Sequence, residues 1–541
     1  MTTPASTDPY LWLEEVESGD ALAWVRAQTA TTADRLHDAA YRSDQDALYE
    51  LATLPSNIPM ITRRGGFVYN FWQDADHVRG IWRRTTLDSY RTDAPDWDVL
   101  LDVDALARDE DEDWVYKGSQ SCEPSHERVL LTLSRGGADA AHIREYDLPT
   151  RSFVNGGFVV PESKSSASWE DADTLLVATT LGEGNATPSG YPRIVRRWTR
   201  GTDFDAAPVV FEGTMDDMAV YGFRDRSPGH ERTIFGRQLT FEESQTYLGE
   251  SAADAVRLDV PLDAALDLDR DWLTLRLKSE WAVGGATYPP DTYLVISAEA
   301  FLSGDRNFHV LFEPKPRRVL MDATWTKSRL VLTIMDNLVT EVLWATPRDG
   351  DWKLEPVAGF PSNATLMVGP LDGGVMSRTD DLLAVVTSFL EPTTMGLFSP
   401  DSDFTVVKTA PSAFDATDLT VSRHEAIAED GERIPYFQIG RESDGPVPTV
   451  LYGYGGFNVP MMPSYLGGIG KVWLEPGNTW VIANLRGGGE FGAEWHKAGM
   501  REGKKTAHDD FAAVARDLLA RGVTTTPQLA CYGGSNGGLL V

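Results

Sequence analysis

Short apolar runs bounded by Gly, Asp, Asn and Pro fill the middle of the chain, from about residue 65 to residue 411. Runs of this kind, with no long amphipathic helix among them, are typical of β-strands. The most similar runs begin at Arg128, Thr174, Glu231, Asp291, Arg329 and Asp381. A recurrence about every fifty residues fits one four-stranded propeller blade per repeat and predicts about seven blades. Because the repeat is loose, a pair of β-sandwiches stays open as the alternative.

The beginning of the chain has a helical pattern instead. Residues 18–20 (Ser-Gly-Asp) can cap a helix in which Leu22, Val25 and Leu36 lie among polar and small residues. A helical segment with so few apolar residues needs another surface on which to pack. We expect this segment to pack on the last domain of the chain.

After Pro411 the pattern changes again. Asp430-Gly431 lies between two strand-like runs and predicts a β-hairpin. Residues 449–452 and 479–485 are short, apolar and flanked by Gly or Pro, as expected for strands that are buried on both faces. These patterns indicate a sheet with a parallel part.

A helix and a further strand follow. Phe511, Val514 and Leu518 lie on one helical stripe, with Asp509 or Asp510 as the N-terminal carboxylate and Gly522 as the stop. Residues 528–532 then form a strand, which completes a βαβ unit. At 541 residues the chain is too long for one core. The predicted domains are residues 1–64 (helical), 65–410 (propeller) and 411–541 (α/β).

The strand at 528–532 leads into Gly533-Gly534-Ser535-Asn536-Gly537, which fits G-x-S-x-G. In a nucleophile elbow, residues almost without side chains permit a sharp strand-to-helix turn that projects the serine oxygen. Ser535 is therefore a candidate nucleophile, and the alternative is a plain glycine-rich turn with an idle serine. Cys531, on the strand before the turn, is expected to be buried and unreactive.

A second glycine cluster matches a different motif. Gly487, Gly489 and Gly492 satisfy G-x-G-x-x-G, and Asp509 follows some twenty residues later. In a dinucleotide fingerprint the third glycine lies in a helix and the acid ends the next strand. Here Asp509 begins a helix and the residues after Gly492 have no apolar stripe, so nucleotide binding is not predicted.

Charge and composition exclude several functions. Asp and Glu number 81 against 49 Lys and Arg, a formal net charge of −32, which disfavours nucleic acid and anionic membranes as partners. Two cysteines, no signal-like start and no long apolar stretch predict a cytoplasmic protein. No Cys or His cluster has metal-ligand spacing, so no metal or other cofactor is expected. We expect a monomer.

Several motifs together resemble the prolyl oligopeptidase family of serine peptidases: DPYLWLEE and WVRAQ near the start, then TVLYGYGGFN, NLRGGGEFGAEWHKAG and YGGSNGGLLV. The resemblance covers the whole chain and implies an α/β-hydrolase catalytic domain joined to a β-propeller, seven-bladed on the repeat count. YGYGGFN is nearer to the prolyl branch than to the oligopeptidase B branch.

The resemblance also implies roles for individual residues. Ser535 would be the nucleophile, and the hydroxyl of Tyr454 with the backbone N–H of Asn536 would form the oxyanion hole. Phe457 would line the S1 pocket, the subsite for the residue before the cleaved bond. A buried aromatic residue is the alternative for Tyr454, and ordinary core packing is the alternative for Phe457.

The implied function is a serine endopeptidase that cleaves short peptides after proline through an acyl-enzyme. In α/β-hydrolases the triad acid and histidine follow the serine, so His496 and His508 are expected to be structural. The acid and histidine would then lie beyond Val541, and we expect the chain to be the N-terminal part of an enzyme, inactive alone. The alternatives are a related oligopeptidase or esterase with another S1 preference and a non-catalytic propeller protein with a relic active site.

Overall fold

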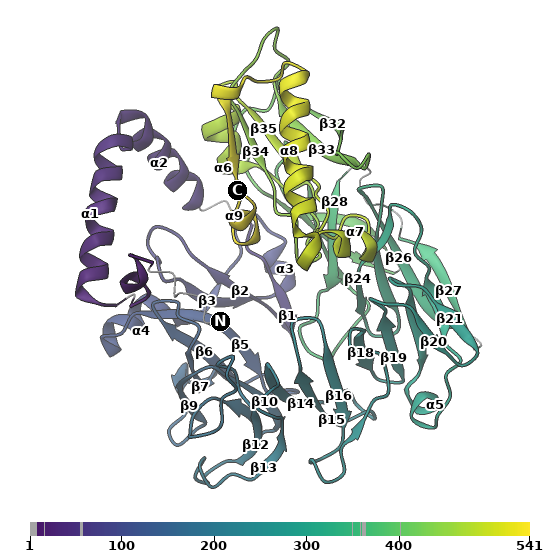
Figure 1. Ribbon diagram of the computed structural model, residues 1–541. Coiled ribbons are helices and arrows are strands. Elements are labelled where there is room, and N and C mark those ends of the chain that lie inside the picture. The colour runs from purple at the N-terminus through teal and green to yellow at the C-terminus, as the bar shows by residue number, and fades with distance from the viewer. Residues whose placement is uncertain are drawn as a thin grey trace, which may run out of the picture.

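The computed structural model describes residues 8–15, 17–54, 58–348, 350–357, 359, 364–400 and 402–541. A ring of β-sheets forms its lower part and a smaller α/β unit its upper part, with two N-terminal helices at one side (Figure 1). Within the predicted helical segment 1–64, residues 1–7, 16 and 55–57 lie outside the described residues.

Seven antiparallel sheets of four or five strands form the ring in the part of the chain that is described. In chain order the first four comprise β1 (Thr62–Arg64) to β4 (Asp98–Asp102), β5 (Trp114–Ser121) to β9 (Val159–Ser163), β10 (Ser165–Asp171) to β13 (Val209–Glu212), and β14 (Ala219–Asp225) to β17 (Val256–Arg257). The fifth comprises β18 (Ala265–Asp269), β19 (Trp272–Arg276), β22 (Tyr293–Ser297) and β23 (His309–Phe312), and β20 and β21 between them form a separate two-stranded sheet. The last two comprise β24 (Arg318–Trp325) to β27 (Asp351–Pro356) and β28 (Thr365–Pro370) to β31 (Ser402–Thr409). The predicted seven-bladed propeller is confirmed, and the alternative of two β-sandwiches is wrong.

The recurring apolar runs are central strands of the blades, which neighbouring blades cover on both faces. Five of the six runs are second strands, namely β6 (Arg128–Arg135), β11 (Thr174–Thr179), β15 (Arg232–Gln238), β25 (Leu330–Asp336) and β29 (Leu382–Thr387). The run at Asp291 is instead β22 (Tyr293–Ser297), the third strand of the fifth blade. That shift explains why the sequence intervals on its two sides, 60 and 38 residues, are unequal.

The α/β unit contains one five-stranded sheet. Its strands lie in the order β32 (Thr420–Ile427), β33 (Arg433–Gly440), β35 (Thr479–Ala483), β34 (Thr449–Tyr452) and β36 (Leu529–Tyr532). β34 is parallel to both β35 and β36, whereas β32 and β33 form the predicted hairpin, with Gly431 at a φ of 89°. Together with the propeller, this sheet confirms the predicted fold class.

Seven helices within the described residues complete the two parts. The propeller carries α3 (Leu87–Tyr90), α4 (Val103–Glu110) and α5 (Ala298–Leu302), and the α/β unit carries α6 (Gly467–Ile469), α7 (Ala493–Ala498), α8 (Lys504–Ala520) and α9 (Asn536–Leu540). In α8, Ala513, Val514 and Leu518 are buried in the main apolar cluster of the α/β unit. Among the described residues, no helix combines the length and apolar character needed to cross a bilayer.

Two local predictions are wrong. α8 begins at Lys504 and not near Asp509, and Asp510 does not cap the helix because its carboxylate accepts hydrogen bonds from the side chain and backbone N–H of Arg486. Cys531 is exposed and not buried. The physical reason is that β36 is the last strand in the sheet order and has no neighbouring strand on its outer side among the described residues.

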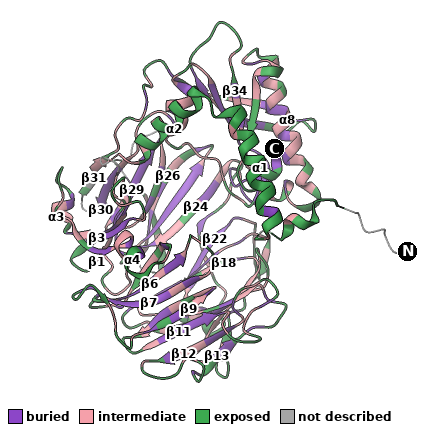
Figure 2. Cartoon of the chain, turned by 90° about the vertical axis from the view of Figure 1, so that its left-hand side faces the viewer, coloured by how far each residue is buried: buried purple, intermediate pink, exposed green. Residues whose placement is uncertain are grey.

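The N-terminal helices are α1 (Gly19–Leu36) and α2 (Ala39–Ala52). As predicted, the region around Ser18 caps α1, since its Oγ accepts a hydrogen bond from the N–H of Ala21 at 3.2 Å. Both helices are largely exposed (Figure 2). Leu48 of α2 lies against Gly468 of the α/β unit. The domain limits at 64 and 410 stay predictions; the first blade begins at Thr62.

The propeller is joined to the α/β unit by polar contacts. Arg317, just before β24, pairs with Glu425 of β32 at 2.8 Å. The N–H of Tyr465 donates to Oγ1 of Thr387 at 3.0 Å, and the N–H of Ala493 donates to the carboxylate of Asp291. These contacts place blade loops of the propeller over the loops of the α/β sheet.

Candidate active site

Ser535 lies at the sharp turn between β36 and α9. Its φ is 54° and its ψ is −117°, a backbone conformation that is uncommon for a residue with a side chain. A Cβ atom on Gly533 would come within 2.2 Å of the carbonyl oxygen of Gly537, and one on Gly537 would come within 2.5 Å of that of Gly453. The serine itself is exposed. The glycines therefore permit a close turn at which Ser535 is exposed to solvent.

Tyr454 lies in the loop that follows β34, next to this turn. β34 and β36 are parallel neighbours with Tyr452 opposite Tyr532, so their following loops leave the sheet at the same edge. Nδ2 of Asn536 donates a hydrogen bond to the carbonyl oxygen of Tyr454 at 2.5 Å. The side chain of Asn536 thus holds the Tyr454 backbone against the turn, while Tyr454 itself is half-buried.

Lys504, at the start of α8, joins the same two loops. Its Nζ donates to Oδ1 of Asn536 at 2.8 Å and to the carbonyl oxygen of Gly455 at 3.1 Å. Burial lowers the pKa of Lys504. Sequence reasoning missed this residue, because 32 positions separate it from Asn536 and no motif connects them.

Phe457 forms part of a cavity beside the turn. Its side chain is 62% exposed, and its φ of 53° is unusual for an aromatic residue. The cavity has a volume of about 320 Å³ and is lined by Glu242, Gly456, Phe457, His496, Gly499, Met500, Arg501, Lys504, Asn536 and Leu539. Of the predicted site residues, Phe457 and Asn536 both line this cavity. Ser535 does not line it but is the residue before Asn536.

Besides Lys504, two lining residues with ionisable side chains, Glu242 and His496, come from parts of the chain that were not predicted to form the site. Glu242 comes from the loop between β15 and β16 (Ser244–Leu248) of the fourth blade, and its carboxylate pairs with Lys278 at 2.8 Å. His496 of α7 lies on the opposite domain, and burial lowers its pKa. Nothing in the sequence around Glu242 indicates a place in this cavity, since more than 200 residues separate it from the α/β motifs.

The glycines of the RGGGEFG segment support the Tyr454 loop. A Cβ atom on Gly487 would lie 2.6 Å from the carbonyl oxygen of Gly455, and one on Gly489 would lie 2.3 Å from that of Asn458. The first and second positions of the apparent nucleotide fingerprint therefore serve close backbone packing. This arrangement explains the cluster without a nucleotide.

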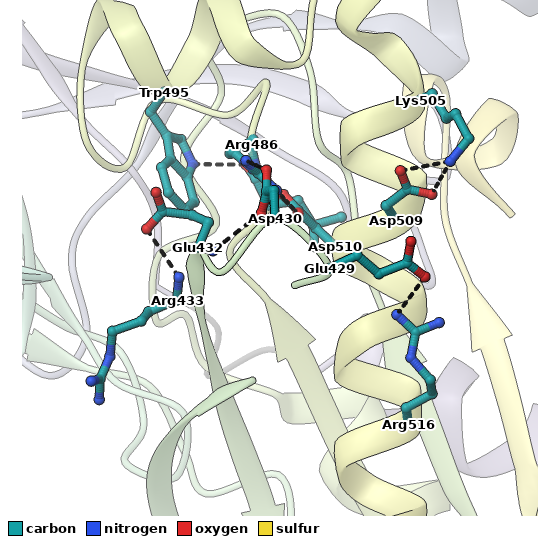
Figure 3. Close-up of polar contacts among 11 residues, drawn as sticks. Glu429, Asp430, Glu432, Arg433, Arg486, Trp495, Lys505, Asp509, Asp510 and Arg516 are labelled. Atoms are coloured by element: carbon teal, nitrogen blue, oxygen red, sulfur yellow. Dashed lines mark hydrogen bonds and ion pairs between the residues drawn. The ribbon is translucent and has the colours of Figure 1, made fainter. Parts of the chain in front are cut away.

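Arg486 anchors this segment to the sheet through two carboxylates (Figure 3). Its guanidinium binds Asp510 at 2.5 Å and Asp430 at 2.5 Å, while Nε1 of Trp495 donates to the carbonyl oxygen of Leu485 at 2.9 Å. The hydrogen bonds to Asp510 and Asp430 raise the pKa of Arg486. The hairpin turn, the glycine segment and α8 are thereby held together beneath the site.

Glu490 is buried behind the same segment. Its Oε1 accepts hydrogen bonds from the N–H of Met461 at 2.8 Å and from Nδ2 of Asn484 at 3.2 Å, whereas its Oε2 has no partner. Burial raises the pKa of Glu490 to about 7. Within the described residues, no group of three or more His, Cys, Asp or Glu side chains is arranged to hold a metal ion.

Comparison with known proteins identifies the family. A family model described as the N-terminal β-propeller domain of prolyl oligopeptidase matches residues 3–271, and one described as the prolyl oligopeptidase family matches residues 469–541. An uncharacterized peptidase of Sinorhizobium fredii is 36% identical over 553 residues, which cover 99% of this chain and 75% of that protein. The prolyl endopeptidase of Elizabethkingia miricola is 26% identical over 562 residues, which cover 99% of this chain and 73% of that protein.

A solved structure agrees with this result. The structure of a post-proline cleaving enzyme from Rickettsia typhi matches with a TM-score of 0.92 at 28% identity, covering 98% of this chain and 79% of that chain. The two family models match parts of the propeller and of the α/β unit, and the solved structure matches both together. The chain therefore belongs to the prolyl oligopeptidase family of serine peptidases.

Proposed function

We propose that this protein is a serine endopeptidase that cleaves short peptides after proline through an acyl-enzyme at Ser535. The observation that carries the proposal is the exposed Ser535 at a positive φ between β36 and α9. Such a strained turn with a projecting hydroxyl is the geometry that a nucleophilic serine requires. Membership of a peptidase family supports the same chemistry.

In this proposal, Oγ of Ser535 attacks the scissile carbonyl and the amine leaves to form the acyl-enzyme, which water then hydrolyses. The hydroxyl of Tyr454 and the backbone N–H of Asn536 stabilise the oxyanion, and each such donor contributes about 3 to 4 kcal/mol to lowering the barrier. Within the described residues, Oγ of Ser535 makes no hydrogen bond with a histidine.

Proline specificity is supported by Phe457 and by the names of two relatives. An exposed aromatic ring beside a cavity of about 320 Å³ offers a flat apolar wall to a proline ring. A post-proline cleaving enzyme and a prolyl endopeptidase are among the similar proteins. An oligopeptidase or esterase with another S1 preference is the second candidate, since five of the ten lining residues have polar or charged side chains that could contact a different substrate residue.

We further infer a cytoplasmic monomer in which the propeller covers the site and excludes folded proteins. Both cysteines are free in the structure, as expected for a reducing compartment. Light scattering during size-exclusion chromatography measures the mass of the particle, and a mass of twice the chain would contradict the monomer.

A serine-reactive fluorophosphonate tests the central proposal on the natural protein. Labelling should occur at Ser535, as located by peptide mass spectrometry, and should disappear in Ser535→Ala. An unlabelled Ser535 would favour the alternative of a propeller protein with a relic active site. Reporter peptides with proline or alanine before the cleaved bond then test specificity, and equal kcat/KM values for the two would reject the proline preference.

A further inference from the structure

A polar segment between β28 and β29 lies across the end of the propeller channel that is remote from the α/β unit. β24 starts at Arg318, next to Arg317, which contacts Glu425 of the α/β unit. The far end of β24, at Trp325, therefore points away from the α/β unit. Residues 371–381 meet the remote ends of strands from four other blades, through Arg63 with Asp372, Glu123 with Val375, Asp269 with Arg378, and Thr326 with Asp380. We call residues 371–381 the hub segment.

A cavity of about 180 Å³ lies between the hub segment and the first four blades. Its lining includes three arginines, Arg64, Arg224 and Arg226, and one carboxylate, Glu123. Both oxygens of Glu123 accept backbone N–H groups of the hub segment, from Val375 at 3.2 Å and from Met376 at 3.1 Å. Glu123 is therefore engaged with the backbone and does not form an ion pair with any of the three arginines.

Two of these arginines have no carboxylate partner. Arg224 pairs with Glu250 at 2.6 Å, but Arg64 and Arg226 form no ion pair in the described part of the chain. Arg64 donates only to Oγ and to the carbonyl oxygen of Ser119, and its Nε is buried without any acceptor. Arg226 donates to the carbonyl oxygen of Glu123 at 2.8 Å.

An unpaired guanidinium in a buried site is energetically costly. The burial of Arg64 is deep enough to lower the pKa of its guanidinium. Ser121 and Ser168 also line this cavity, together with Gly373 and Gly374 of the hub segment, so hydroxyl groups and backbone lie beside the two unpaired cations. Arginines grouped in this way, with hydroxyls beside them, have the chemistry of a site for phosphate-like anions.

A second cavity on the other side of the hub segment is also cationic. It has a volume of about 250 Å³, shares Val375 with the first, and is lined by Arg270, Lys327 and Arg378 and by no carboxylate. Arg270 and Arg378 share the carboxylate of Asp269, and Lys327 forms no ion pair among the described residues. This concentration of positive charge occurs in a chain whose net charge is −32.

We propose that the cavity between the hub segment and the first four blades binds a small multivalent oxyanion of the phosphate class, held by Arg64 and Arg226. A volume of about 180 Å³ accommodates such an ion but is below the range of about 300 to 1,000 Å³ that drug-sized ligands occupy. The Glu123 carboxylate in the same cavity attracts Arg64 without pairing with it, and the bound anion supplies the direct ion pair that Arg64 lacks. The anion also bridges the first and fourth blades. This site is separate from Ser535 and does not depend on the proposed peptidase activity.

Calorimetric titration of the 541-residue protein with inorganic phosphate, at an ionic strength held constant with sodium chloride, tests the proposal. We expect saturable binding, and a thermal midpoint that rises with phosphate and not with an equivalent addition of chloride. Arg64→Gln and Arg226→Gln should each weaken phosphate binding at least about tenfold, since each removes a charged hydrogen-bond donor. Arg64→Gln should fold at least as well as the wild type without phosphate, because it removes an unpaired buried charge.

Arg257→Gln is the matched control, since Arg257 lies exposed on β17 of the fourth blade and the substitution removes the same charge. Its phosphate affinity should equal that of the wild type. A thermal response to phosphate no larger than that to chloride, or the same loss of binding in Arg257→Gln as in Arg226→Gln, would overturn the proposal.

Discussion

Lys504 and Asn536 are joined by a hydrogen bond of 2.8 Å from Nζ to Oδ1, which connects the start of α8 to the turn at Ser535. Nζ also donates to the carbonyl oxygen of Gly455, and Nδ2 of Asn536 donates to the carbonyl oxygen of Tyr454. The start of α8, the loop after β34 and the turn before α9 are therefore connected through one ammonium group. The relative position of the proposed nucleophile and the proposed oxyanion donor thus depends on a residue that contacts neither hydroxyl in the structure.

Lys504→Met should slow the reaction of Ser535. The substitution keeps the aliphatic chain but removes both hydrogen bonds, and a hydrogen bond to a charged group contributes about 1.5 to 3 kcal/mol. We expect the second-order rate constant for fluorophosphonate labelling of the natural protein to fall about tenfold or more. Lys505→Met is the control, because the adjacent Lys505 is exposed and, within the described part of the chain, forms an ion pair with Asp509 alone. Equal rates in the two variants would show that Lys504 does not position the site.

The two glycines before Ser535 should respond differently to alanine. In Gly533→Ala the new Cβ would lie 2.2 Å from the carbonyl oxygen of Gly537, so the turn must open. We therefore expect slower fluorophosphonate labelling of Ser535 and a lower thermal midpoint. A Cβ on Gly534 meets nothing within 4 Å, so Gly534→Ala should keep both properties. Thermal unfolding and labelling of the two variants provide the comparison, and tolerance of Gly533→Ala would contradict the close turn.

Asp510 and Asp430 bind the same guanidinium of Arg486 but should differ in their effect on stability. The side chain of Asp510 is 0% exposed and that of Asp430 is 55% exposed. Asp510→Ala leaves a buried arginine without its buried counter-charge and should lower the free energy of unfolding by about 3 to 5 kcal/mol. Asp430→Ala should cost about 1 kcal/mol or less, because water screens an exposed pair. Urea unfolding at pH 7 measures both, and equal losses would contradict the difference in burial.

Glu490 should make the protein less stable as the pH rises towards neutrality. Its pKa is about 7 in the folded protein against an ordinary value of 4.5, so between these values the folded state binds a proton that the unfolded state has lost. The free energy of unfolding should therefore fall from about pH 4.5 to about pH 7, by up to about 3 kcal/mol, and stay lower above that range.

Glu490→Gln should remove this contribution, because the amide stays neutral in the same site. Urea unfolding between pH 5 and pH 8 should give a flatter pH dependence for Glu490→Gln than for the wild type. Glu502→Gln, at an exposed position of the same domain, should keep the wild-type slope. An unchanged slope in Glu490→Gln would mean that the carboxyl group is ionised in the folded protein.

Much of the fold follows from local patterns. The strand predicted at 449–452 is β34, and the strand predicted at 528–532 is β36, which begins one residue later. Both were predictable because a short apolar run bounded by Gly or Pro favours a buried strand. The run at Asp291 shows the limit of this reasoning, since apolar character does not distinguish the second strand of a blade from the third. The sequence does not predict the start of α8, because the mostly polar residues 504–508 show no apolar stripe. In the structure Lys504 forms a hydrogen bond with Asn536, and Ala507 is buried in the main apolar cluster of the α/β unit.

The amino-acid sequence by itself determined where the chain can turn sharply, where strands and helices form, and that Ser535 lies at the turn between β36 and α9, since these properties depend on neighbours within a few positions. Only the tertiary structure decided that Glu242 of a blade loop lines the cavity beside Phe457, that Asp510 binds Arg486 instead of capping a helix, and that Cys531 is exposed. Contacts of this kind join residues far apart in the chain, and their partners follow from how blades and sheet pack, which no local periodicity records.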